Sequence, residues 1–214
     1  DVNKEIREMD LKQKDMEKTL EEIRKGLSDK DNKLRENQVL YHSENSTLEA
    51  LQNLTERYEG YGGSVKKVME QKGNTKGIIG VVADIIKVEK KYETAIEIAL
   101  GGNIQNIVTE DESTAKEMIQ FLKQNKSGRA TFLPLTSITK PQEFKTPEVL
   151  DEKGVIGMAN ELVSIEEKYK NVAKAMLGRI VVVDNIDNAV KIAKKFDYGV
   201  RMVTLEGELL VPGG

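Results

Sequence analysis

Residues 1–58 carry a heptad repeat of apolar residues that no proline interrupts. Apolar residues at alternating spacings of three and four are typical of a coiled coil. At about 1.5 Å per residue, a helix of this length would extend roughly 87 Å, far beyond a helix that packs only on its own domain. The segment therefore predicts a coiled-coil arm whose apolar seam needs a second helix. Its core positions are Ile6, Gln13, Leu20, Leu27, Leu34, Tyr41, Leu48 and Thr55 in one row, and Val2, Met9, Met16, Ile23, Lys30, Asn37, Glu44, Leu51 and Tyr58 in the other.

Polar residues interrupt one row of this seam. Lys30, Asn37 and Glu44 occupy successive core positions of the same row. Each would have to lose water or push the paired helices apart, so we expect the coiled coil to be loosest there. No returning helix follows in this sequence, and we expect the arm either to fray or to borrow a helix from a neighbouring molecule.

Beyond the arm, residues 59–214 are numerous enough for one compact core or two small subdomains. The chain has 33 basic and 36 acidic residues, and subtracting the arm's 11 and 14 leaves 22 of each for this part. Net charge therefore gives no argument for nucleic-acid binding, and only local basic patches can carry one.

The side chains available limit the chemistry. The chain has no cysteine, which excludes disulfides and thiolate metal sites and fits a reducing compartment. Its single histidine, His42, lies on the arm. We expect no metal and no cofactor. No apolar run approaches the length of a membrane span and none has the form of a signal segment, so we expect no membrane partner.

The globular part contains one pattern twice, always 77 residues apart. Such a repeat indicates two related lobes that arose by duplication. The first copy is Gly77-Ile-Ile-Gly80, Glu89, Lys91, Tyr92 and Leu100-Gly101, and the second is Gly154-Val-Ile-Gly157, Glu166, Lys168, Tyr169 and Leu177-Gly178.

Each copy predicts both helix and strand, and therefore an α+β fold of two mixed α/β lobes behind the arm. We expect a lobe at 59–135, a proline-containing linker at 136–153 and a lobe at 154–214. The predicted elements of the first copy are extended Ile78–Val88, a helix Tyr92–Leu100 with a left-handed cap at Gly101, a strand Ile104–Val108 and a helix Ser113–Gln124. Those of the second are a helix ending at Leu177 with Gly178 as its cap, a strand Ile180–Val183, a helix Ile186–Phe196 and a hairpin of Arg201–Leu205 with Glu208–Val211.

No motif predicts an active site. Gly60-Tyr61-Gly62-Gly63 lacks the third glycine of a dinucleotide fingerprint and follows a helix, so we interpret it as a flexible exit from the arm. The pairs Glu89/Tyr92 and Glu166/Tyr169 could be imagined as acid and base, but a charge at a helix start beside a packed ring explains them better. We expect no catalytic residue.

Several distinctive runs follow the arm. They are Gly60-Tyr-Gly-Gly-Ser-Val-Lys-Lys-Val68, Gly80-Val-Val-Ala-Asp-Ile-Ile86, Tyr92-Glu-Thr-Ala-Ile-Glu-Ile-Ala-Leu-Gly101, Gly128-Arg-Ala-Thr-Phe-Leu-Pro-Leu135, and Thr204-Leu-Glu-Gly-Glu208 through Pro212-Gly-Gly214. Together with the arm, these runs closely resemble the hinge domain of bacterial SMC (structural maintenance of chromosomes) proteins with part of the adjoining coiled coil. The resemblance covers nearly the whole chain, and the run that begins at Gly128 is its most specific part.

The resemblance implies a hinge at which the parent polypeptide folds back, its arm pairing with a returning helix of the same polypeptide that leads to a distant ATP-binding head. It also implies a toroidal hinge homodimer that serves chromosome condensation and segregation in the cytoplasm, on the nucleoid. Gly213 and Gly214 match the first of two glycine pairs that lie at the family's dimer contact. The chain begins within a heptad and stops at this pair, so we expect it to be part of a longer protein.

Hinge domains of this family can also bind DNA, which makes local basic clusters candidate contacts. Such residues would neutralise phosphates without reading sequence, so binding should weaken with salt. One cluster lies near the arm exit and one around the helix of 113–124: Lys66, Lys67, Lys72 and Lys76, and Lys123, Lys126 and Arg129.

Two other functions compete with the non-enzymatic dimerisation hinge. One is a small-molecule-binding or catalytic α/β domain with a coiled-coil regulatory arm, which a closed pocket with convergent polar groups would favour. The other is a coiled-coil spacer with a folded stopper, which dimer contacts along the lobe edges would count against. The duplication favours the hinge, because two related lobes in each of two chains can close a ring.

Overall fold

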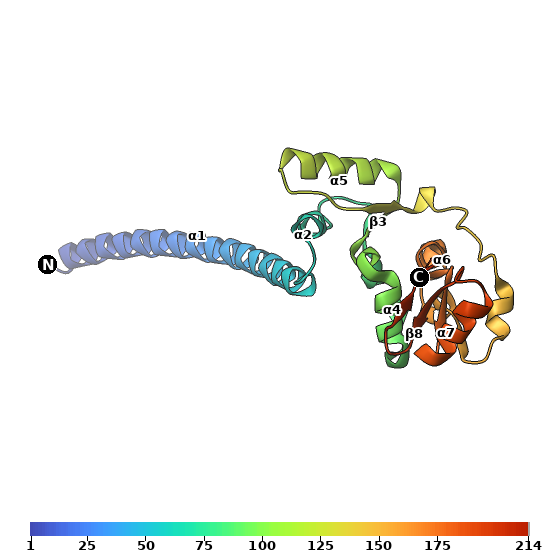
Figure 1. Cartoon of the computed structure of the whole chain (residues 1–214). Coiled ribbons are helices and arrows are strands. Elements are labelled where there is room, and N and C mark those ends of the chain that lie inside the picture. Colours follow the sequence, from blue (N-terminus) through green and yellow to red (C-terminus); the bar gives the residue numbers. More distant parts are fainter. Residues whose placement is uncertain (214) are drawn as a thin grey trace. The chain divides into compact units, whose positions relative to one another are not determined.

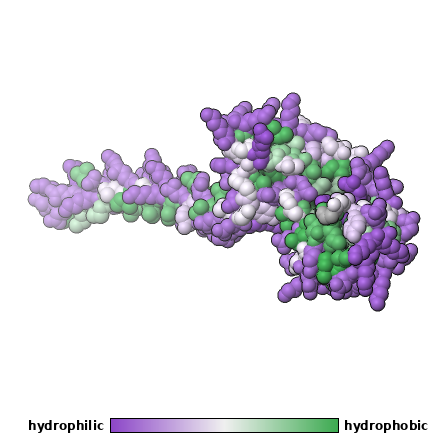
Figure 2. Space-filling model, in the orientation of Figure 1, coloured by the Kyte–Doolittle hydropathy of each residue, from purple (hydrophilic) through white to green (hydrophobic). Residues whose placement is uncertain are grey.

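The computed structural model describes residues 1–213, without the side chain of Leu54, and separates two compact units, Asp1–Arg57 and the residues from Tyr58 onward (Figure 1). Helix α1, Val2–Arg57, makes up the first unit. It is continuous, so the expected fraying is not found there. Its seam is uncovered: Met9, Met16 and Ile23 are each about two thirds exposed, and Figure 2 shows apolar side chains along α1 among hydrophilic ones.

The second unit mixes helices with short strands, which confirms the predicted α+β fold. Within the described residues, no helix has the length and apolar character needed to cross a membrane. In chain order the elements are α2 Gly63–Glu70, β1 Ile78–Val81, α3 Val82–Ile85, β2 Lys87–Val88, α4 Glu93–Leu100, β3 Ile107–Thr109, α5 Glu112–Gln124, β4 Phe132–Pro134, β5 Val155–Met158, β6 Val163–Ser164, α6 Lys170–Leu177, β7 Ile180–Val183, α7 Ile186–Lys195, β8 Arg201–Thr204 and β9 Leu209–Leu210.

Helices α5 and α7 begin with the same local device. The side chain of Asp111 accepts a hydrogen bond from the backbone N–H of Thr114 at 2.8 Å, and that of Asn185 accepts one from Asn188 at 2.9 Å. Each bond satisfies a backbone donor that the first helical turn leaves unpaired. The Thr114 N–H also lowers the pKa of the Asp111 carboxyl. The helices that follow β3 and β7 thus start in the same way.

The two lobes contain equivalent sheets. In the first, with strand order β1-β3-β4, β1 is antiparallel to β3 and β3 is parallel to β4. In the second, with order β5-β7-β8-β9, β5 is antiparallel to β7, β7 is parallel to β8, and β9 is added antiparallel to β8. Both β1 and β5 show an irregularity of register just before the second glycine of the repeat, Gly80 or Gly157. The duplication is therefore present in the three-dimensional structure, and β4 and β8 are equivalent strands.

The lobes meet through equivalent elements. Strand β2 pairs antiparallel with β6, and Lys87 lies opposite Ser164, the residue 77 positions later that is its own counterpart in the repeat. Helix α4 packs against its counterpart α6. Contacts of this kind define an approximate two-fold axis between the lobes, as in an isologous dimer.

One hydrophobic core crosses this axis. Val82, Ile96 and Val108 of the first lobe lie in the same buried cluster as Leu177 and Val182 of the second. The segment expected to be a linker contributes to the second lobe, where Val149 of a short 3-10 helix, Pro147–Asp151, is completely buried. The lobes are therefore halves of one packed unit.

Three local expectations were wrong. Ile78–Val88 is not extended throughout, because the helical turn α3 interrupts it; the Asp84 side chain accepts the Val81 N–H at 3.0 Å and so closes this turn. The strand expected from Ile104 begins only at Ile107, since Gly101–Gln105 forms a 3-10 helix. Tyr58 is not a seam residue but belongs to the second unit, where only 3% of it is exposed.

The equivalent glycines Gly101 and Gly178 follow α4 and α6 for different reasons, and neither adopts the expected left-handed helical conformation. Gly101 has φ +51° with ψ −132°, a region that favours glycine. Gly178 has φ −70° and ψ 0°, but a Cβ there would clash with the carbonyl oxygen of Lys174. Glycine is required by backbone conformation at the first position and by space at the second.

We expect Gly178→Ala to lower the free energy of unfolding by about 1–3 kcal/mol, because the new methyl group must push away main-chain atoms. Urea denaturation followed by the NMR signals of strand β7 measures this. Gly102→Ala is the matched control, since a Cβ at Gly102 would meet nothing within 4 Å. Equal stability of the Gly178 variant and the unaltered chain would show that the Lys174 carbonyl moves aside freely.

Candidate functional site

The two sheets differ at one edge. Strand β9 covers the outer side of β8, whereas among the described residues no strand covers the outer side of its counterpart β4. The β8–β9 hairpin is closed by the backbone N–H of Thr204, which donates to the carbonyl of Glu208 at 2.9 Å. Leu209 of β9 is 44% exposed at the sheet edge. The unit therefore has one uncovered β4 edge in one lobe and one exposed β9 edge in the other.

Gly213 follows β9 in a defined conformation. Its backbone N–H donates to the carbonyl oxygen of Tyr198 at 3.2 Å. Its φ is +93°, a conformation that residues with a Cβ rarely adopt. A Cβ at this position would meet nothing within 4 Å, so the backbone there is open to close approach by another chain. Gly214, the other expected dimer residue, lies outside the described residues.

Residues 58–62, at the start of the second unit, are fixed on the first lobe by hydrogen bonds. The Tyr58 hydroxyl donates to Asp84 Oδ2 at 2.5 Å, and the Tyr61 ring packs edge-on against the Tyr58 ring at 5.4 Å. The Gly62 N–H donates to Gln105 Oε1 at 3.1 Å. The glycine-rich segment was expected to be flexible, because its sequence does not indicate the distant partners Asp84 and Gln105 that hold it.

The two expected basic clusters lie on adjoining elements. Helix α2 packs against α5, and the Ser64 hydroxyl of α2 donates to the carbonyl of Ser127, in the turn after α5, at 2.8 Å. A Cβ on Gly128 would come within 2.6 Å of the Ser64 hydroxyl oxygen, so a glycine permits this approach. Lys66 and Lys67 lie on α2 and Lys72 and Lys76 in the turn after it, while Lys123 lies on α5 and Lys126 and Arg129 in the segment leading to β4.

These basic side chains are available to an anion. Lys66 is half-buried and the other six are exposed. Within the described part of the chain, none of the seven forms an ion pair with an acidic side chain. The fold therefore gathers both clusters around the contact of α2 with the turn after α5, although their sequence positions are up to 63 residues apart.

The duplicated Glu and Tyr residues hold a lysine between them. Lys91 Nζ lies 3.1 Å from Glu89 and 4.7 Å from the centre of the Tyr92 ring, and the second copy repeats this with Lys168 at 3.2 and 4.8 Å. Hydrogen bonding to Glu89 is the main cause that raises the pKa of Lys91. Hydrogen bonding to the Tyr169 hydroxyl, then to Glu166, raises that of Lys168. These are ion-pair and cation–π contacts at helix starts. The expectation from the sequence named only the glutamates and tyrosines, although the repeat also contains the lysines that join them.

Residues 1–213 contain no group of three histidine, cysteine, aspartate or glutamate side chains placed to hold a metal ion. The arrangement of the second unit is that of a two-lobed α+β domain, joined about a pseudo-two-fold axis and attached to a coiled-coil helix.

Comparison with known proteins identifies the family. The model of the flexible hinge domain of SMC proteins matches residues 75–193, more than half of the chain. The chromosome partition protein Smc of Clostridium kluyveri is 40% identical over 198 residues, which cover 90% of this chain and 17% of that protein. The Smc protein of Bacillus subtilis is 38% identical over 172 residues, covering 79% of this chain and 14% of that protein.

Solved structures agree with this result. The crystal structure of an asymmetric dimer of the Geobacillus stearothermophilus SMC hinge domain matches with a TM-score of 0.69 and 37% identity, over 79% of this chain and 71% of that chain. The Pyrococcus furiosus SMC hinge domain matches with a TM-score of 0.59 and 34% identity, over 79% of this chain and 86% of that one. The chain belongs to the SMC hinge family. It spans only 14–18% of the length of the curated relatives it matches.

We expect Tyr58→Phe to lower the free energy of unfolding by about 1.5 kcal/mol, because it removes a hydrogen bond to a half-buried carboxylate. Urea denaturation followed by NMR signals of the sheet strands measures the change. Tyr198→Phe is the control, since Tyr198 is 47% exposed. A loss of the same size in both variants would mean that the bond to Asp84 adds nothing specific.

Proposed function

We propose that this chain is a non-enzymatic dimerisation hinge that joins two copies of a chromosome partition protein of the SMC type. The observation that carries the proposal is the unequal covering of equivalent strands: β9 pairs with β8, but no strand of the described part of the chain pairs with the corresponding side of β4. An uncovered strand edge presents main-chain donors and acceptors that another chain can pair with.

Two such chains can pair their open sheet edges with each other. Each copy offers the open β4 edge in its first lobe and the β9 end with Gly213 in its second. A two-fold axis between copies brings the β4 edge of each to the β9 end of the other and so makes two identical contacts, which closes a ring. Glycine at this end lets two backbones approach without a Cβ between them. The Geobacillus stearothermophilus hinge structure, an asymmetric dimer, supports the pairing of two hinge domains.

The uncovered seam of α1 fits the same proposal. Its apolar side chains are exposed along the helix, and a returning helix of the same polypeptide would bury them. The curated relatives are more than five times as long as this chain, which leaves ample polypeptide for such a helix and for a separate ATP-binding head. We place the protein in the cytoplasm, on the nucleoid, in keeping with relatives named for chromosome partition.

We expect Gly213→Asp combined with Gly214→Asp to abolish hinge pairing in the intact parent protein, because each contact would then have to accommodate two charged side chains between closely spaced backbones. Sedimentation velocity distinguishes monomer from dimer. The control carries the same charges at Gly73 and Gly102, where a Cβ meets nothing within 4 Å. An unchanged dimer in the first variant contradicts the assigned contact, and so does equal dissociation of the control.

We propose that the hinge also contacts DNA without reading its sequence, through the seven basic residues around α2 and the turn after α5. Their exposure and the lack of acidic partners among the described residues support this, because phosphate binding needs cations that are not already neutralised. The first cluster includes no interleaved aromatic residue of the kind that stacks single-stranded bases, so the surface suits backbone phosphates.

We expect Lys66→Glu with Lys67→Glu to weaken retention of duplex DNA in a gel shift at low salt and to reduce the salt dependence of binding by about one counterion per lysine. The control is Lys191→Glu with Lys194→Glu on α7, two exposed lysines in the other lobe. If both variants retain equally less DNA, the effect comes from net charge alone. If neither variant retains less DNA, α2 is not part of the DNA-binding surface.

A further inference from the structure

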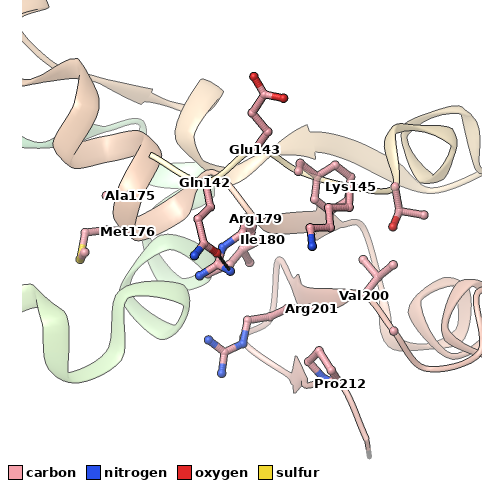
Figure 3. Close-up of a pocket in the computed structure, with 13 residues that line it drawn as sticks. Gln142, Glu143, Lys145, Ala175, Met176, Arg179, Ile180, Val200, Arg201 and Pro212 are labelled. Atoms are coloured by element: carbon pink, nitrogen blue, oxygen red, sulfur yellow. Dashed lines mark hydrogen bonds between the residues drawn. The ribbon is translucent and has the colours of Figure 1, made fainter. Parts of the chain in front are cut away.

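The second lobe contains a cavity of about 480 Å³ on which three separate segments converge (Figure 3). One wall is the segment 142–146, which leads into the lobe. The second is the end of α6 with the turn into β7, and the third is the start of β8 together with Pro212. Its volume is typical of sites that bind small molecules.

Three cationic side chains line this cavity, one from each wall. They are Lys145, Arg179 and Arg201. Arg179 is held in place, because its Nη1 donates to Gln142 Oε1 at 2.6 Å. Within residues 1–213 none of the three forms an ion pair, and Figure 3 shows the Glu143 carboxylate pointing away from them. The cavity therefore has a concentration of positive charge that the protein itself does not neutralise.

The duplication shows that the fold does not require these charges. The strand registers place Gln105 of the first lobe at the position of Arg179, because Ile107 of β3 and Val181 of β7 are equivalent. The strand registers place Thr131 at the position of Arg201, since β4 and β8 pair with β3 and β7 in the same way. Both first-lobe counterparts are uncharged although the strands of the two sheets pair in the same way. The arginines of the second lobe are thus an addition to a common scaffold.

The remaining lining is mostly apolar. Phe144, Ile180 and Val200 contribute to the walls, and Val200 belongs to the buried core of this lobe. Arginine's planar fork matches the oxygens of a phosphate group, and a nearby lysine adds a point charge. An apolar wall beside such cations suits a phosphate that carries a small organic group.

We propose that this cavity binds a phosphate group, with Arg179 and Arg201 as its ligands and Lys145 as a third cation. The group can belong to a free phosphate compound or to the backbone of DNA. The free compound would be a function beyond the proposed hinge, whereas the DNA source rests on the DNA contact proposed above.

Calorimetric titration of the chain with inorganic pyrophosphate at low ionic strength tests the free source. We expect one saturable site that Arg179→Gln with Arg201→Gln weakens at least about tenfold, because each substitution removes a charge-assisted hydrogen bond. Gln142→Ala should weaken it less, by releasing Arg179 without removing its charge. Lys191→Gln with Lys194→Gln, a loss of equal charge on α7, should leave it unchanged. Both arginines are exposed, so the variant should keep its melting temperature.

A gel shift with duplex DNA tests the second source. If Arg179→Gln with Arg201→Gln lowers the retention of DNA, the α7 control does not, and pyrophosphate does not bind, then the cavity binds DNA phosphates. This outcome is separate from the Lys66 and Lys67 test, which examines another surface. The proposal is overturned if pyrophosphate shows no saturable binding and DNA retention is unchanged, or if the α7 control loses as much binding as the arginine variant.

Discussion

The antiparallel pairing of β2 with β6, together with the packing of α4 on α6, organises the globular unit. Because Lys87 lies opposite its own repeat counterpart Ser164, both halves present the same surface to each other. The buried cluster that includes Val108 and Val182 then forms across the axis and not within either half. Neither lobe could bury this surface alone, so the internal two-fold contact is a condition for the stability of both.

A repeated fold turns small differences between its copies into functional differences. β4 and β8 occupy the same place in their sheets, yet within residues 1–213 only β8 is covered by a further strand. This inequality leaves two different edges in one chain, which is what a ring of two chains needs. Gln105 and Arg179 likewise lie at equivalent positions before β3 and β7, and the second copy has a cation there, beside a cavity. In both cases one copy has a feature that the other lacks, although the two share the same scaffold.

Much of the architecture was predictable because its signals are local. The heptads gave α1, the strand Ile180–Val183 was predicted at its observed bounds, and the helices near 113–124 and 186–196 differ from their predictions by one residue. The errors arose where a distant partner decides the local conformation. Asp84 closes a turn inside a β-branched run, and Asp84 and Gln105 hold the segment from Tyr58 to Gly62 that sequence alone suggested to be flexible.

The sequence by itself determined the coiled-coil arm, the duplication, the α+β class and the resemblance to SMC hinges, because periodicity and repeat spacing are encoded along the chain. Only the tertiary structure decided which edges stay open, that residues near Lys66 and Arg129 adjoin, and that Lys145, Arg179 and Arg201 surround one cavity. These features depend on which segments meet in space. That meeting is set by the packing of the two halves about their common axis, and no local pattern of residues records it.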